Sequence, residues 1–208
     1  MGDTRLRQLE REAAGGDLQA RAHLLRERTR TGDLASERLS LAAYLGDEAS
    51  REALALGSVD DEPSLESWVR GLSDWGEPAC ARAAAAAARL LWPRVPVEDE
   101  LPRRALASVE AFLECPCASH RLAVIELSQA RSNPEGWTVP RWALPTPEMA
   151  AWWATVVVWG PNIRQGPTIH PAEATWGGVH AVVRSLGANA EESVRAAIRT
   201  ALVPWALR

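Results

Sequence analysis

Three residues whose side chains bind soft metals lie within six positions of one another, in the segment CPCASH that runs from Cys115 to His120. Zinc sites use thiolate sulfur and imidazole nitrogen in this way, and Cys80 offers a fourth ligand. The paired C-x2-C knuckles of established zinc motifs are missing, and no second ligand pair follows. The pattern favours a helix-to-helix corner whose thiols are buried in the core. We therefore predict no metal and no cofactor, with Cys115, Cys117 and His120 as the ligands if an ion is bound.

The same segment invites a test for covalent catalysis. A nucleophilic cysteine needs a histidine positioned as its base and a third group that orients the histidine. Cys117 and His120 are three residues apart at an expected helix start and can meet, but no local signature of a cysteine enzyme surrounds them. The remaining histidines, His23, His170 and His180, are isolated in the sequence. We predict no catalytic residues and a non-enzymatic protein.

Tryptophan is the unusual feature of the composition, with ten residues against one Tyr and one Phe. Most of them are expected in the core, because Trp buries a large apolar area. Four, however, lie around a proline-rich connection and a following loop, together with two arginines, and Trp and Arg dominate binding hot spots. The predicted partner-binding surface consists of Trp137, Arg141, Trp142, Trp159, Arg164 and Trp176.

Composition and charge limit the classes of function. The 208 residues are 47% hydrophobic and 24% charged, which is typical of a globular chain, and the net charge of −4 gives no reason to expect nucleic acid. All 23 basic residues are Arg, which excludes a Schiff-base lysine and a P-loop lysine. The charged N-terminus lacks a secretory h-region, and the longest apolar run, 149–159, is shorter than a membrane span. We expect a cytoplasmic protein with reduced cysteines and no membrane partner.

Helix signals divide the chain into a leader and a larger domain. Residues 1–58 are expected to form two helix hairpins, because Gly-Asp pairs combine a helix stop with the cap of the next helix. The expected helices span 4–14, 17–31, 34–45 and 47–56. Residues 63–208 are expected to form the second domain, after a short acidic linker.

The second domain contains an alanine-rich helix and a helix corner. The helix at 77–92 is expected to be central, because its small side chains let neighbouring helices approach closely. Glu98 to Arg131 reads as two helices broken at Pro116, and the second restarts through Leu122, Ile125 and Leu127. A Pro- and Trp-rich connection at 132–147 leads to an apolar helix. Residues 155–159 of this helix also suit a strand, and periodicity leaves both open.

Two resemblances extend these observations. The pattern LxxLExxA…LLRERxRxGxLxxERLxLAAYLG at 6–46 resembles a leader of many uncharacterised myxobacterial proteins, which carries no functional implication. The spacing D/E-x-x-P-R-x-A-L-x-x-x-x-x-F/W-L, from Asp99 to Leu113 after the alanine-rich helix, resembles a bacterial all-helical family of immunity proteins over about 65–131. This second resemblance implies a toxin or effector protein as the partner.

Together these observations predict an all-α protein of ten or eleven helices, with a helical-repeat-like leader packed on an orthogonal or solenoid-like bundle. The predicted function is a non-enzymatic protein-binding module, because helix stacks expose broad surfaces and no residues assemble a recognised active site. The alternative is a small-ligand-binding protein or enzyme with a pocket in the C-terminal half, lined by Trp and by Arg141, Arg164 and either His170 or His180. The identity of the partner and the oligomeric state are left open.

Overall fold

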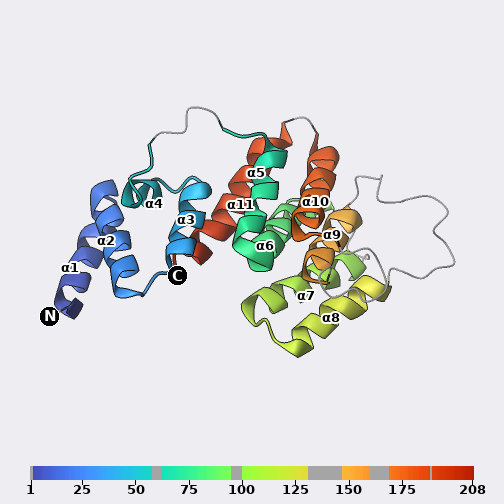
Figure 1. Ribbon diagram of the computed structural model, residues 1–208. Helices are drawn as coiled ribbons and strands as arrows, with labels where there is room; N and C mark the ends of the chain where they lie inside the picture. Colours follow the sequence, from blue (N-terminus) through green and yellow to red (C-terminus); the bar gives the residue numbers. More distant parts are fainter. Residues whose placement is uncertain (1, 58–61, 95–99, 131–146, 160–168, 188) are drawn as a thin grey trace. The chain divides into compact units, whose positions relative to one another are not determined.

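The computed structural model describes residues 2–57, 62–94, 100–130, 147–159, 169–187 and 189–208, and within these ranges the protein is all-α (Figure 1). The predicted fold class is therefore confirmed, whereas the repeat-like character of the leader stays a prediction. The first helices are α1 (Gly2–Ala14), α2 (Leu18–Thr31), α3 (Ser36–Tyr44) and α4 (Glu48–Ala53). The following elements are α5 (Leu65–Gly71), η1 (Leu72–Trp75), α6 (Gly76–Arg89), η2 (Trp92–Arg94), α7 (Glu100–Glu114), α8 (Ala118–Ala130), α9 (Pro147–Trp159), α10 (Pro171–Leu186) and α11 (Ala190–Ala206).

The chain divides into two compact units. The first contains Met1–Glu62 and also Arg199–Arg208, and the second contains Pro63–Ile198. The last ten residues were expected in the second domain, whereas the structure groups them with the first unit, where Leu207 packs against buried leucines. Helix α11 therefore begins in the second unit and ends in the first.

In the first unit, each Gly-Asp pair was expected to end one helix at the glycine and to cap the next helix with the aspartate. The pair at 46–47 does so, whereas the pair at 32–33 does so only in part. Gly46 has a left-handed φ of 93°, and Asp47 accepts a hydrogen bond of 2.8 Å from a main-chain N–H in the first turn of α4. Gly32 likewise ends α2 in the left-handed conformation. Asp33, however, accepts from a threonine hydroxyl, and α3 begins three residues later, at Ser36. The Gly-Asp pattern therefore marks each break correctly but not each cap.

The core of the first unit takes in the C-terminus of the chain. Leu25, Leu34, Leu39 and Ala49 form a buried cluster, and Leu207 packs against it. Arginine side chains hold the same segment by donating to main-chain oxygens. Arg28 donates to Leu207 O at 2.8 Å, Arg38 to Trp205 O, and Arg199 to Leu45 O at 3.0 Å.

Helix α6 lies at the centre of the second unit, as predicted, and packs against α7, α9 and α10. Its alanines are almost all buried, which lets these neighbours come close. Helix α10 contributes a second close approach, because a Cβ atom added at Gly177 would lie 2.8 Å from the indole ring of Trp153 on α9. Glycine at this position therefore makes room for a large aromatic ring between two helices.

Residues 155–159 belong to helix α9, so the strand alternative is wrong. Thr155, Val156, Val157 and Val158 are all buried, along with Ala150, Ala151 and Ala154. Helix α9 contacts α6, α7, α8 and α10. A helix surrounded by four others is apolar nearly all round, which explains why its sequence shows no one-sided pattern.

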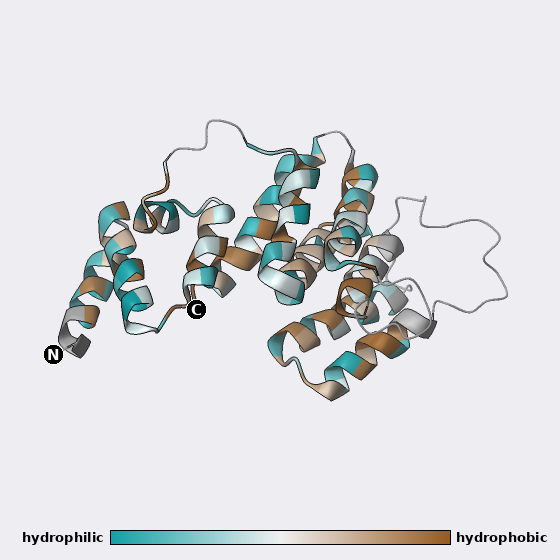
Figure 2. Ribbon diagram, in the orientation of Figure 1, coloured by the Kyte–Doolittle hydropathy of each residue, from teal (hydrophilic) through white to brown (hydrophobic). Residues whose placement is uncertain are grey.

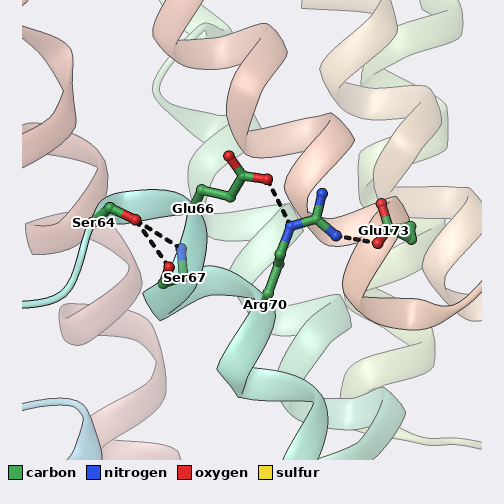
Figure 3. A network of polar contacts seen from close by, with 5 residues as sticks. All are labelled: Ser64, Glu66, Ser67, Arg70 and Glu173. Carbon is green, nitrogen blue, oxygen red and sulfur yellow. Dashed lines mark hydrogen bonds and ion pairs between the residues drawn. The ribbon is translucent and has the colours of Figure 1, made fainter.

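Polar contacts also join helices of the second unit at its surface (Figure 3). Ser64 caps α5, because its hydroxyl accepts the main-chain N–H of Ser67 at 3.2 Å. Arg70, near the end of the same helix, bonds Glu66 one turn earlier at 2.8 Å and also reaches Glu173 on α10. One guanidinium thus connects two helices that lie about a hundred residues apart in the sequence.

Among the described segments, no helix has both the length and the apolar character that crossing a bilayer requires.

Candidate functional site

The corner between α7 and α8 places Cys115, Cys117 and His120 together. Helix α7 closes with a bond from the N–H of Cys115 to Ala111 O (3.0 Å), and Pro116 prevents its continuation. The N–H of Cys117 then turns back to Cys115 O at 2.7 Å. Cys117 O accepts the N–H of Arg121 at 3.1 Å and so begins α8. Cys117 therefore occupies the position just before the N-terminus of a thirteen-residue helix.

The three side chains of this group, which we name the thiol corner, are close to one another and partly exposed to solvent. One ligand atom from each of Cys115, Cys117 and His120 can be chosen so that all three lie within 4.8 Å of one another. The sulfur of Cys117 lies 3.4 Å from His120 Nδ1, which also lies 2.9 Å from Cys115 O. Cys115 is exposed and Cys117 is half-buried, so the expectation that these thiols are buried in the core is wrong. They lie where α7 ends and α8 begins.

The two thiols of the corner differ in their electrostatics. The hydroxyl of Ser119, 3.1 Å from the sulfur of Cys117, does most to lower the pKa of Cys117, to about 6. The main-chain N–H of His120 and the Cys115 thiol favour the thiolate further. In turn, the hydrogen bond with Cys117 and its negative charge raise the pKa of Cys115. At neutral pH the corner therefore carries one thiolate, at Cys117, beside one thiol.

The difference in pKa between Cys117 and Cys115 predicts selective alkylation of the metal-free protein. With a limiting amount of iodoacetamide we expect Cys117 to react before Cys115, because the thiolate is the nucleophile. The rate of alkylation at Cys117 should rise with pH, with a midpoint near pH 6. Peptide mass spectrometry after short reaction times at a series of pH values measures this. Ser119→Ala removes the main hydrogen bond to the sulfur and should move the midpoint upward. An unchanged midpoint in that variant, or first reaction at Cys115, would contradict the assignment.

Cys80, the fourth ligand that the sequence offered, does not join the corner. It is fully buried in α6, and burial raises the pKa of its thiol. Cys80 is therefore a core thiol and is separate from the corner.

Most of the predicted Trp/Arg surface lies outside the described residues, namely Trp137, Arg141, Trp142 and Arg164. Trp159 is the last residue of α9, and its side chain is not among those described. Trp176, on α10, is half-buried with its ring centroid 5.4 Å from that of His180. The assembly of these six residues into one surface stays a prediction.

The three histidines outside the thiol corner lie at separate positions, on helix α2, at the N-cap of α10 and on α10. His23 is exposed on α2. His170 is the N-cap of α10, and its Nδ1 accepts the main-chain N–H of Ala172 at 3.3 Å. His180 is exposed ten residues further along the same helix, about 15 Å away along the axis. His170 and His180 therefore do not meet, and His170 already has a structural role.

One exposed feature was missed by the sequence reasoning. Leu122, expected on the apolar stripe of α8, has 57% of its surface exposed. Ala118 and Glu126, one turn before and one turn after it, are exposed as well. We name these three residues the α8 outer surface. Figure 2 shows apolar colouring along much of α8, which packs on α7 and α9. Because this helix is apolar on several sides, its sequence did not distinguish the covered side from the open one.

No family model, curated protein or solved structure matches the chain. The resemblances of the leader and of residues 65–131 therefore stay predictions. The class that the described residues define is an all-helical protein with an exposed thiol corner between two helices.

Proposed function

We propose that this protein is a non-enzymatic helical module that binds another protein through a surface that includes the α8 outer surface. The observation that carries the proposal is the exposure of Leu122 on a helix of apolar composition. Burial of this leucine against a partner would be favourable, because each square ångström of apolar surface removed from water contributes about 25 cal/mol. Leu122 also falls within the segment that resembles immunity proteins, which makes a toxin or effector protein the proposed partner.

The predicted Trp/Arg residues extend this proposal. Trp137 and Trp142 follow α8 in the sequence, and Trp and Arg are the residue types that contribute most to binding at hot spots. We place the protein in the cytoplasm, where such a partner would meet it.

A capture experiment from the native host tests the proposal. We expect the intact protein to retain one specific protein partner and Leu122→Glu to lose it, because a charge at the centre of an apolar contact remains desolvated and unpaired. A hot-spot loss of 2 kcal/mol corresponds to about a thirtyfold weaker Kd. The affinity of the captured partner for each variant, measured by calorimetry, gives this number.

The chain offers a matched control. Among the residues whose exposure the structure describes, Leu56 is the other large hydrophobic residue with high exposure, at 54%, and it belongs to the first unit. Leu56→Glu should keep the partner, and circular dichroism should show unchanged helix content in both variants. A triple change of Trp137, Trp142 and Arg164 to Ala tests the second part of the surface. Equal binding by Leu122→Glu and the intact protein would remove α8 from the interface.

The alternative, a ligand pocket or enzyme site in the C-terminal half, gains no support from the described residues. His170 is engaged in capping, and His180 is an exposed residue whose ring lies tilted beside that of Trp176. Arg141 and Arg164 lie outside the described part of the chain. We therefore propose the binding module ahead of this alternative.

A further inference from the structure

We propose that the thiol corner binds a zinc ion through the sulfurs of Cys115 and Cys117 and the imidazole of His120. This inference does not depend on the proposed protein-binding function. It rests on three metal-binding groups that the fold brings together at an exposed turn, although the sequence spacing did not favour a metal there.

The separations of the ligand atoms are close to those of a tetrahedral zinc site. Zinc binds thiolate sulfur at about 2.3 Å and imidazole nitrogen at about 2.0 Å, so the ligand atoms themselves lie about 3.6–3.8 Å apart. The Cys117 sulfur and His120 Nδ1 are already 3.4 Å apart. The largest separation among the three groups is at most 4.8 Å, so closure requires a movement of about 1 Å. Rotation of an exposed cysteine side chain supplies a movement of this size.

The backbone at the corner holds the ligands in place before a metal arrives. Pro116 fixes one dihedral between the two cysteines, and the N–H of Cys117 closes a tight turn on Cys115 O. His120 lies in the first turn of α8, three residues after Cys117, so its ring points back toward that cysteine. The main-chain N–H of Arg121 fixes Cys117 O. Three ligands from one rigid turn lose little conformational freedom on binding, which favours affinity.

The ligand set selects the metal. Two thiolates and one imidazole suit zinc, whereas magnesium and calcium prefer oxygen ligands. Coordination through His120 Nδ1 replaces the contact of this nitrogen with Cys115 O, and the ring proton then resides on Nε2. Three protein ligands leave the fourth position of the tetrahedron free for water, in the manner of open zinc sites. The exposure of Cys115 leaves room for this fourth ligand.

Metal titration of the full-length, tag-free protein tests the proposal. After removal of metals with a chelator, zinc is added in competition with a chromophoric chelator, and cobalt is used as a spectroscopic probe. We expect one zinc per chain, and with cobalt both a thiolate-to-metal charge-transfer band and the visible bands of a tetrahedral site. Removing an outer hydrogen-bond partner of a metal ligand typically weakens metal binding by roughly 10–100-fold. Loss of a ligand itself should weaken zinc binding by more than this in each of three variants, Cys115→Ser, Cys117→Ser and His120→Ala.

Matched controls separate the corner from other ligands. Cys80→Ala removes the buried thiol and should leave zinc affinity unchanged. If this core variant fails to fold, His180→Gln serves the same purpose, because it removes an exposed histidine elsewhere. Circular dichroism confirms that each variant remains helical. The proposal is overturned if zinc binds without a thiolate band in the cobalt form, if binding survives the loss of both corner cysteines, or if no stoichiometric binding occurs.

Discussion

Deleting Arg199–Arg208 is expected to unfold the first unit and to leave the second unit folded. These ten residues belong to the first unit although they end the sequence. Leu202 and Ala206 are completely buried, and Leu207 packs on the cluster that includes Leu25 and Leu39. Removing them opens the core of the first unit along one side.

The free-energy cost of this deletion is similar in size to the free energy of unfolding of the whole first unit. At roughly 0.05–0.15 kcal/mol per residue, a unit of about 70 residues is stable by roughly 4–10 kcal/mol. Truncation of a single buried leucine costs about 2–5 kcal/mol. The deletion removes two leucine side chains and the main-chain oxygens to which Arg28 and Arg38 donate. Its free-energy cost is therefore comparable to the total stability of the first unit.

Hydrogen exchange followed by mass spectrometry measures the outcome. Peptides from residues 1–62 should lose protection in the deletion variant, whereas peptides from α6, α9 and α10 should keep it. Adjacent positions provide a point-mutation control: Leu202→Asp buries a charge and should act like the deletion, and Ala201→Asp, at an exposed site, should not. Retained protection in α2 and α3 after the deletion would show that the leader folds without the end of α11.

Arg121→Met is expected to lower the free energy of unfolding by about 2–5 kcal/mol, because this side chain joins four helices of the second unit. Its guanidinium donates to Val158 O at the end of α9 (2.9 Å) and pairs with Glu77 of α6 (3.0 Å). It also stacks over the ring of Phe112 on α7, with 4.7 Å to the ring centroid. Arg121 itself belongs to α8.

The separate contributions add up to this range. A hydrogen bond from a charged group contributes about 1.5–3 kcal/mol, a partly exposed ion pair about 0.2–1 kcal/mol, and the stacking about 0.5–1 kcal/mol. Arg121→Lys should recover only part of the loss, because an ammonium group cannot make two directed bonds and stack at once.

Urea unfolding of the full chain, followed by tryptophan fluorescence and circular dichroism, measures the change. Arg104→Met, at an exposed position of α7, is the matched control and should alter stability by less than about 0.5 kcal/mol. Equal stability of the Arg121 and Arg104 variants would show that the contacts of Arg121 contribute nothing net.

Features that depend on a few neighbouring residues could be predicted from the sequence. Glycine at a left-handed position, proline at a helix boundary and short capping side chains act on the backbone within one turn. For this reason the break at Pro116 and the stop at Gly46 were found where they were expected. The all-α class follows from many such local signals acting together.

The candidate site was only partly predictable. The spacing of Cys115, Cys117 and His120 showed that the three side chains can meet, and the structure brings them within 4.8 Å. Their exposure was predicted wrongly, because a thiol is small and apolar enough to suit either a core or a turn. Whether a cysteine is covered depends on whether another part of the chain packs over the corner, and the local spacing carries no information about that.

The sequence by itself therefore determined the helices, their ends and the chemistry available at one corner. Only the tertiary structure decided that the last ten residues complete the first unit, that Leu122 faces solvent, and that Thr155–Val158 lie inside a helix surrounded by four others. The physical reason is that the period of apolar residues marks which side of a helix avoids water but carries no information about which other helix covers it.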